Sequence, residues 1–203
     1  MPNWVRNKIT FYGPQERIAT LKSFVVTNDS QFDFNKIHPM PEALWEAPAE
    51  EEVQICAMAC YEAKEKDLNT CDAYEKRAFG YDFQDLILKG RICKENEAAF
   101  GFRDWYHWRL FNWGTKWNST DATWNGNVCT FDTAWSTPEQ IYEKLSLIFP
   151  DITFDVLFAD EDLGRNCGTI HYNEDEGQVV VNYTDDLNFA CRVWGTTPDM
   201  QDE

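Results

Sequence analysis

The stretch VCTFDTAWSTPEQIYEKLSLIFPDITFDVLF, residues 128–158, carries the pattern that decides the fold. Apolar and polar residues alternate near both of its ends, over 128–135 and 152–158, as they do in strands with one buried face. Between these segments, residues 136–139 supply the hydroxyl, proline and acid typical of a helix start. The apolar residues that follow recur at helical spacing: Ile141, Leu145 and Ile148. The stretch therefore predicts a β-α-β unit.

The beginning of the chain repeats this pattern weakly. Residues 7–12 alternate like a strand, residues 13–16 open a helix with Pro14 in its first turn, and residues 32–37 alternate again. Two β-α-β units, with helices on one face of a mainly antiparallel sheet, describe an α+β ferredoxin-like sandwich. The name concerns the chain path, because the cysteine spacing of an iron–sulfur protein is absent.

The remaining segments extend this sandwich. Residues 166–172 and 178–183 predict a hairpin around an acidic turn, and residues 185–195 predict a short helix ending at Gly195. The long connection at about 38–127 is rich in helix formers, so we expect a helical and aromatic insertion there. Residues 1–203 are thus interpreted as one domain with an insertion at 38–127 and a hairpin plus helix at about 165–195.

The charge of the chain is strongly negative and unevenly spread. Its 35 acidic and 18 basic side chains give a net charge of −17, whereas a 15% aromatic content excludes general disorder. The excess lies in residues 42–75, with ten acids and two bases, and in residues 151–203, with 13 acids and two bases. This balance argues against binding of a nucleic-acid backbone, which requires Lys and Arg.

Three interpretations of the acidic segments remain open. They could provide solubility, a docking face for a basic protein, or an imitation of a phosphate backbone that occupies a nucleic-acid channel. In the second and third cases the carboxylates pair with Lys or Arg of the partner. The expected contact residues are Glu50, Glu51, Glu52, Glu174, Asp175, Glu176, Asp185 and Asp186.

The segment Trp113-Gly-Thr-Lys-Trp-Asn118 is the most distinctive motif of the chain. As a ligand or peptide site it would use Trp113, Trp117 and Trp135 for stacking and Lys116 for a hydrogen bond. Alternatively, these Trp side chains pack the insertion onto the sheet, because Trp buries a large apolar area. The sequence leaves both interpretations open.

Four motifs occur in order and together resemble the YubB-like family, whose proteins have a ferredoxin-like domain and are carried by bacterial plasmids and phages. They are Met1-Pro-Asn-Trp4, Phe34-x-x-Ile37-x-Pro39-Met40-Pro41, Trp113-Gly-Thr-Lys-Trp-Asn118 and Phe131-x-Thr-Ala-Trp135-Ser-x-Pro138. Val5-Arg6 departs from the pattern, because many relatives have Cys there. The resemblance implies the fold and a mobile-element setting, with no reaction attached.

Catalytic and metal-binding signatures are absent from the sequence. It contains no HExxH, nucleophile elbow, GxGxxG or P-loop, and its three His are scattered at positions 38, 107 and 171. Cys56 and Cys60 share a helix face, yet no CxxC or neighbouring His completes a four-ligand set. We therefore expect a protein that is not an enzyme and has neither cofactor nor metal.

The seven cysteines and the lack of apolar segments bear on the compartment. An odd, scattered set of Cys is atypical of a secreted disulfide framework, and neither a signal peptide nor a membrane span is visible. With the resemblance, this predicts a cytoplasmic protein of a bacterial host. The expected function is binding of a basic host protein or nucleoprotein complex, possible roles being nucleic-acid mimicry or anti-defence inhibition such as anti-CRISPR activity, with neither nucleic acid nor membrane as a direct partner.

Overall fold

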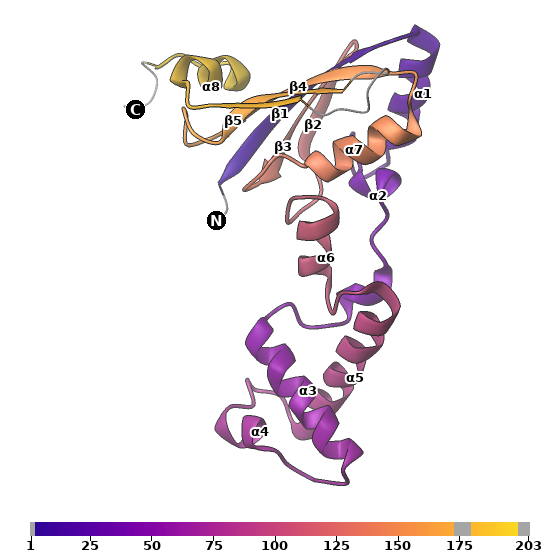
Figure 1. The fold of residues 1–203 in the computed structure, drawn as a ribbon, viewed down its shortest axis with the longest axis vertical. Helices are drawn as coiled ribbons and strands as arrows, with labels where there is room; N and C mark the ends of the chain where they lie inside the picture. The colour runs from indigo at the N-terminus through magenta and orange to yellow at the C-terminus, as the bar shows by residue number, and fades with distance from the viewer. Residues whose placement is uncertain (1–2, 173–179, 199–203) are drawn as a thin grey trace. The chain divides into compact units, whose positions relative to one another are not determined.

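The computed structural model describes residues 3–172 and 180–198, and the chain forms two compact units. The sheet unit comprises residues 1–39 and 112–203, and the helical unit comprises residues 40–111. The elements of each unit can be followed along the colour gradient of Figure 1.

The sheet unit is built on six antiparallel strands in the order β2-β3-β1-β4-β5-β6. The strands are β1 (Trp4–Tyr12), β2 (Thr120–Asn125), β3 (Val128–Ala134), β4 (Thr153–Asp160), β5 (Cys167–Tyr172) and β6 (Val180–Thr184). Its helices are α1 (Gln15–Val25), α2 (Phe34–Ile37), α7 (Glu139–Ile148) and α8 (Leu187–Trp194). The path β1-α1-β2-β3-α7-β4, in which β3 and β1 lie between β2 and β4, confirms the predicted ferredoxin-like α+β fold.

The two faces of the sheet are covered differently. Alternate residues of β1, among them Ile9 and Phe11, point into a core beneath α1 and α7. On the opposite face, α8 packs Ala190 and Val193 against Ala159 of β4. The predicted C-terminal hairpin and helix are therefore present as β5, β6 and α8, with Asp186 as the N-cap of α8 and Gly195 as its C-cap.

One predicted strand is wrong. Residues 32–37 contain the short helix α2, since Phe34 and Ile37 are both buried at helical spacing and Asp33 accepts a hydrogen bond from the backbone N–H of Asn35 at 2.9 Å. The strand that belongs there topologically is β2, which lies inside the range predicted as insertion. The turn before β3 contains Gly126 with φ +59°, a conformation typical of tight hairpins.

The helical unit agrees with the helix-forming composition of its sequence. Its elements are a 3₁₀ turn, η1 (Glu42–Trp45), and the helices α3 (Glu51–Glu65), α4 (Asp72–Lys76), α5 (Phe83–Phe100) and α6 (Trp105–Asn112), the last of which ends at the unit boundary. Gly90 permits the close approach of α3 and α5, because a Cβ at this position would lie 2.2 Å from the backbone oxygen of Ala57. No helix of the described residues is long and apolar enough to cross a membrane.

Candidate functional sites

Trp113, the first residue of the distinctive motif, belongs to the core of the sheet unit. Its side chain is fully buried, its Nε1 donates a hydrogen bond to the backbone oxygen of His38 at 2.8 Å, and its ring meets the edge of Phe34. Trp113 is therefore a packing residue. The accessible part of the predicted aromatic site is reduced to Lys116, Trp117 and Trp135.

The backbone of the motif is bound to the junction between β3 and α7. Thr115 Oγ1 donates to the backbone oxygen of Ala134 at 2.8 Å, and Ser136 Oγ donates to the backbone oxygen of Gly114. Gly114 has φ +77°, which few side chains tolerate. Hydrogen bonds thus join two separate sequence motifs, so several of their residues have a structural role.

Asn118, the last residue of the motif, has a similar structural role. Its Oδ1 accepts a hydrogen bond from the backbone N–H of Phe34 at 2.9 Å, and its Nδ2 donates to Asp33 Oδ1 at 2.8 Å. Asn118 therefore holds the first turn of α2 against the start of β2.

Lys116 lies between two indole rings. Its Nζ is 5.0 Å from the ring centroid of Trp117 and 5.1 Å from that of Trp135, distances at which a cation is attracted to an aromatic face. Trp117 also contacts Trp4, with ring centroids 5.7 Å apart. The three predicted residues thus form one cluster at the surface of the sheet unit.

Trp135 has a conformation that is unusual for a bulky residue. Its φ is +69°, and 42% of its surface is exposed. The backbone is held there because its N–H donates to the backbone oxygen of Asn3 at 2.9 Å and its carbonyl accepts from Asn166 Nδ2 at 3.1 Å. An exposed aromatic ring held in a strained conformation is a feature that clusters at functional sites.

The predicted acidic contact residues lie on both units. Glu50, Glu51 and Glu52 are exposed at the start of α3 in the helical unit, and Asp185 and Asp186 are exposed before α8 in the sheet unit. The other three, Glu174, Asp175 and Glu176, lie outside the described residues.

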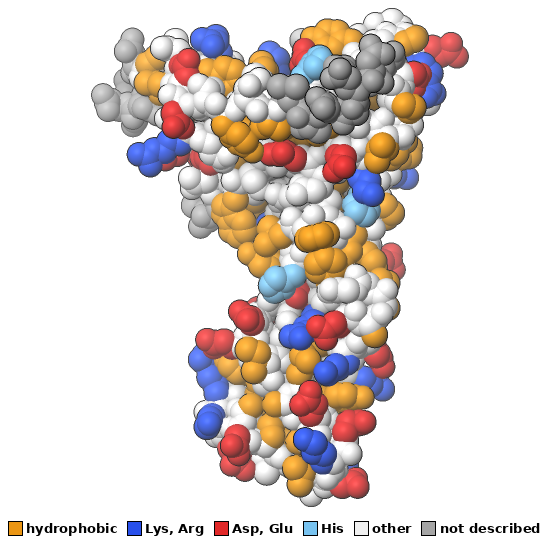
Figure 2. Space-filling view, in the orientation of Figure 1, with side chains coloured by type: hydrophobic (Ala, Val, Ile, Leu, Met, Phe, Trp, Pro, Cys, Tyr) orange, Lys and Arg blue, Asp and Glu red, His pale blue; other side chains and the backbone are white. Residues whose placement is uncertain are grey.

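These carboxylates differ in their local partners. Glu52 forms an ion pair with Arg77 at 3.3 Å, and Asp186 accepts a hydrogen bond from the backbone N–H of Phe189 at 3.0 Å. Within residues 3–172 and 180–198, no Lys or Arg forms an ion pair with Glu50, Glu51 or Asp185. On the visible face of the helical unit, acidic and basic side chains are interspersed (Figure 2).

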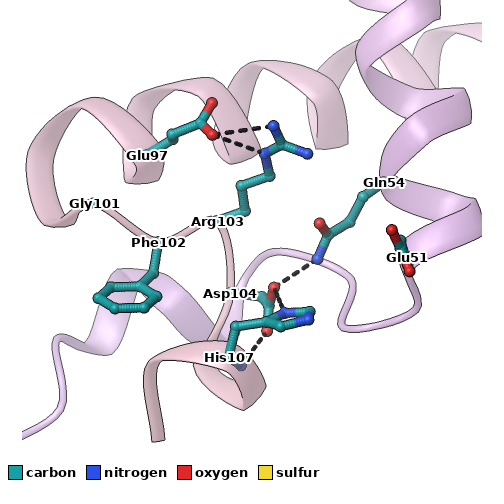
Figure 3. A pocket seen from close by; sticks show the side chains of 8 residues that line it. All are labelled: Glu51, Gln54, Glu97, Gly101, Phe102, Arg103, Asp104 and His107. Atoms are coloured by element: carbon teal, nitrogen blue, oxygen red, sulfur yellow. Dashed lines mark hydrogen bonds and ion pairs between the residues drawn. The ribbon is translucent and has the colours of Figure 1, made fainter. Parts of the chain in front are cut away.

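A hollow of about 220 Å³ in the helical unit was not found from the sequence. Its lining includes Asp104, which is fully buried and lies between Gln54 and His107 (Figure 3). Asp104 Oδ2 accepts from Gln54 Nε2 at 2.6 Å and is 2.7 Å from His107 Nδ1. Arg103 and Glu97 form an ion pair at 3.0 Å on the lining, to which the predicted contact residue Glu51 also contributes.

The chemistry of this hollow is that of an oriented histidine. When the proton is on Nδ1, Asp104 fixes the tautomer and leaves Nε2 as an acceptor. None of the residues that line the hollow is Ser, Thr or Cys. Asp104 also caps α6 by accepting from the backbone N–H groups of Tyr106 and His107 at 2.8 and 3.0 Å. The sequence offered one signal, an Asp three residues before a His, but the contact with Gln54 spans 50 residues.

A comparison with protein families finds a similarity in the C-terminal part of the sheet unit. A family model described as "Ferredoxin-like domain in Api92-like protein" matches residues 112–202. The match begins where the helical unit ends, and it excludes β1 and α1, which complete the fold. The match supports the ferredoxin-like domain and does not confirm the YubB-like family that the motifs resemble.

One solved structure is similar over most of the chain. It is the crystal structure of the protein api92 from Yersinia pseudotuberculosis, with 10% sequence identity, coverage of 91% of this chain and 98% of that chain, and a TM-score of 0.41. No curated protein matches this chain.

Proposed function

We propose that this protein is a non-enzymatic binding protein of a phage or plasmid, and that it acts on a host macromolecular complex through exposed carboxylates. The partner is a basic surface of a host protein or nucleoprotein complex in the bacterial cytoplasm, and the specific role is inhibition of a defence complex, with nucleic-acid mimicry as one form. The resemblance to the YubB-like family supports the mobile-element setting. The net charge of −17 supports a basic partner.

The observation that carries this proposal is that the side chains of Glu50, Glu51 and Asp185 are exposed and lack a described cationic partner. None of the three forms an ion pair with a described Lys or Arg. Carboxylates of this kind retain their charge for an external cation and accelerate association at low salt. Glu52 and Asp186 are less available, because Arg77 and the first turn of α8 already engage them.

A salt-dependent binding experiment tests this proposal. The full chain, immobilised at low salt, should retain a basic host protein that is released as the ionic strength rises. The variant Glu50→Lys/Glu51→Lys should lose at least tenfold in affinity for that protein, and Asp185→Lys should also weaken binding. Reversal of Glu174, Asp175 and Glu176 tests the remaining predicted contacts.

The matched control is Glu65→Lys, a charge reversal at the other end of α3, where Glu65 is also exposed. It should change affinity less than threefold. Equal losses of affinity in all variants would show that only the net charge matters. Retention of the host protein that does not depend on salt would contradict the proposal.

A second candidate function is a small-ligand or peptide site at Lys116, Trp117 and Trp135. The observation that favours it is the strained, exposed conformation of Trp135 beside the ammonium group of Lys116. Ligand-observed NMR with a fragment and peptide library would detect binding. Lys116→Ala should remove it without lowering the melting temperature, whereas a Trp117→Ala variant that merely unfolds would show that the cluster is structural.

A further inference from the structure

Two cysteine sulfurs of the helical unit lie next to each other. Cys60 Sγ and Cys71 Sγ are 3.6 Å apart, and the residues are separated by 11 positions in the chain. Cys60 is fully buried on α3, whereas Cys71 is half-buried and is the N-cap residue of α4. Cys71 is therefore the more exposed residue of the pair.

Cys60 has two neighbouring thiols, those of Cys71 and Cys56, and the Cys56 thiol also has a backbone partner. Both thiols adjoin a small core that includes Cys56 and Leu86. The Sγ of Cys56, one turn earlier on α3, donates to the backbone oxygen of Arg77 at 3.4 Å. In the part of the chain that the structure describes, no group of three or more His, Cys, Asp or Glu is arranged to hold a metal ion, so the contact is not part of a metal site.

We propose that Cys60 and Cys71 form a reversible redox pair that a peroxide converts into an intramolecular disulfide. The half-buried Cys71 sulfur attacks a peroxide oxygen, so that an S–O bond forms, the O–O bond breaks and one water leaves. The Cys60 sulfur then attacks Cys71, so that the S–S bond forms, the S–O bond breaks and a second water leaves. Together the two thiols lose two electrons and two protons, and hydrogen peroxide takes up these electrons and protons to become two waters.

The order of the two steps follows from burial. Burial of Cys60 raises the pKa of its thiol and keeps it protonated, which makes it a poor first nucleophile. Once Cys71 is a sulfenic acid, the adjacent Cys60 sulfur needs little movement to reach it. Since Cys60 must lose its proton in this step, the disulfide should form faster as the pH rises.

The link would join two elements of the helical unit. It would attach the start of α4 to α3 and close the loop between them, in which Asp67 adopts a positive φ of 59°. Constraining this loop lowers the entropy of the unfolded chain. The oxidised protein should therefore have a higher melting temperature than the reduced protein, an effect that dithiothreitol reverses.

Peptide mapping of the full chain treated with hydrogen peroxide tests the proposal. After free thiols are blocked with N-ethylmaleimide, digestion and mass spectrometry should show one peptide pair linking Cys60 to Cys71, with two hydrogens lost. In Cys60→Ser, Cys71 should stop at the sulfenic acid and react with dimedone. In Cys71→Ser, the buried Cys60 should stay reduced at the same peroxide dose. Cys93→Ser, a change at a buried thiol of the same unit, should leave the link intact.

Several results would overturn the inference. These are a link that joins Cys60 to Cys56, a link between two molecules, or oxidation of Cys71 to the sulfinic acid with Cys60 still free. If a serine variant does not fold, the mapping of the unmodified chain decides the question alone, because it requires no substitution.

Discussion

Arg6 on β1 and Asp132 on β3 lie opposite each other on adjacent strands and form a two-point ion pair. Arg6 Nε and Nη2 each lie 2.9 Å from one carboxylate oxygen. The guanidinium also stacks on the ring of Trp194 in α8, 4.1 Å from its centroid. One side chain thus connects two central strands to the helix that covers this end of the sheet.

Replacement of Arg6 by Lys should reveal the value of this geometry. A lysine keeps the charge but loses the paired hydrogen bonds and the flat contact with Trp194, so we expect a loss of about 1–2 kcal/mol in the free energy of unfolding. Urea denaturation measures it. Lys8→Ala, an exposed change on the same face of β1, should cost under about 0.5 kcal/mol. Equal losses for both would mean that the pairing contributes nothing specific.

Asn7 organises a fully buried polar network beneath the sheet. Its Nδ2 donates to Val5 O and Thr133 Oγ1, and its Oδ1 accepts from Thr137 Oγ1 at 2.7 Å and Tyr142 OH at 2.9 Å. Asn7→Leu should cost about 2–4 kcal/mol, because it leaves buried donors without an acceptor. Tyr142→Phe removes one of these donors and should cost about 1 kcal/mol in the same assay.

Gly90 controls the contact between α3 and α5. A methyl group there would lie 2.2 Å from Ala57 O and 2.8 Å from Tyr61 Cβ, so the two helices must separate. Gly90→Ala should therefore destabilise the helical unit by about 2–4 kcal/mol despite the better helix propensity of Ala. Hydrogen exchange can locate the loss. The control Gln84→Ala, at an exposed position of α5, should leave protection of the helical unit unchanged.

His38 should make stability depend on pH. Burial lowers the pKa of its imidazole below the ordinary value of 6.5, opposed by the hydrogen bond to the backbone oxygen of Asn112. The unfolded chain therefore binds this proton at a higher pH than the folded protein does. Stability from this group is fully present above about pH 6.5 and decreases as the pH falls toward the folded pKa.

Two measurements check the His38 prediction. His38→Gln should flatten the stability curve between roughly pH 5 and pH 7. An NMR titration of the wild-type imidazole should give a midpoint below 6.5. A midpoint at or above that value would contradict the assigned role of burial.

The contrast between residues 32–37 and 120–125 shows what sequence patterns could predict. Alternation over 32–37 predicted a strand, yet Asp33 caps a helix turn there, so short-range capping outweighed a six-residue pattern. Residues 120–125 lack a regular apolar alternation, and their strand is established by pairing with β3. Where the period extended over a whole β-α-β unit, as in residues 128–158, the prediction agrees with the structure.

The candidate sites show the same division. The Trp113–Asn118 motif was recognisable as a unit, but the sequence could not tell its core residue Trp113 from the exposed Trp135 of the Phe131–Pro138 motif. The contact of Gln54 with Asp104 and the approach of Cys60 to Cys71 had no local signal, because each depends on how helices pack.

The sequence by itself determined the β-α-β unit of residues 128–158, the surplus of acidic side chains and the helix-rich middle, because periodicity and composition act locally or by summation. Only the tertiary structure decided which strand pairs with β3, which carboxylates form no ion pair, and which thiols and indole rings are in contact. These properties depend on distances between residues far apart in the chain, and such distances are set when strands pair and buried faces pack.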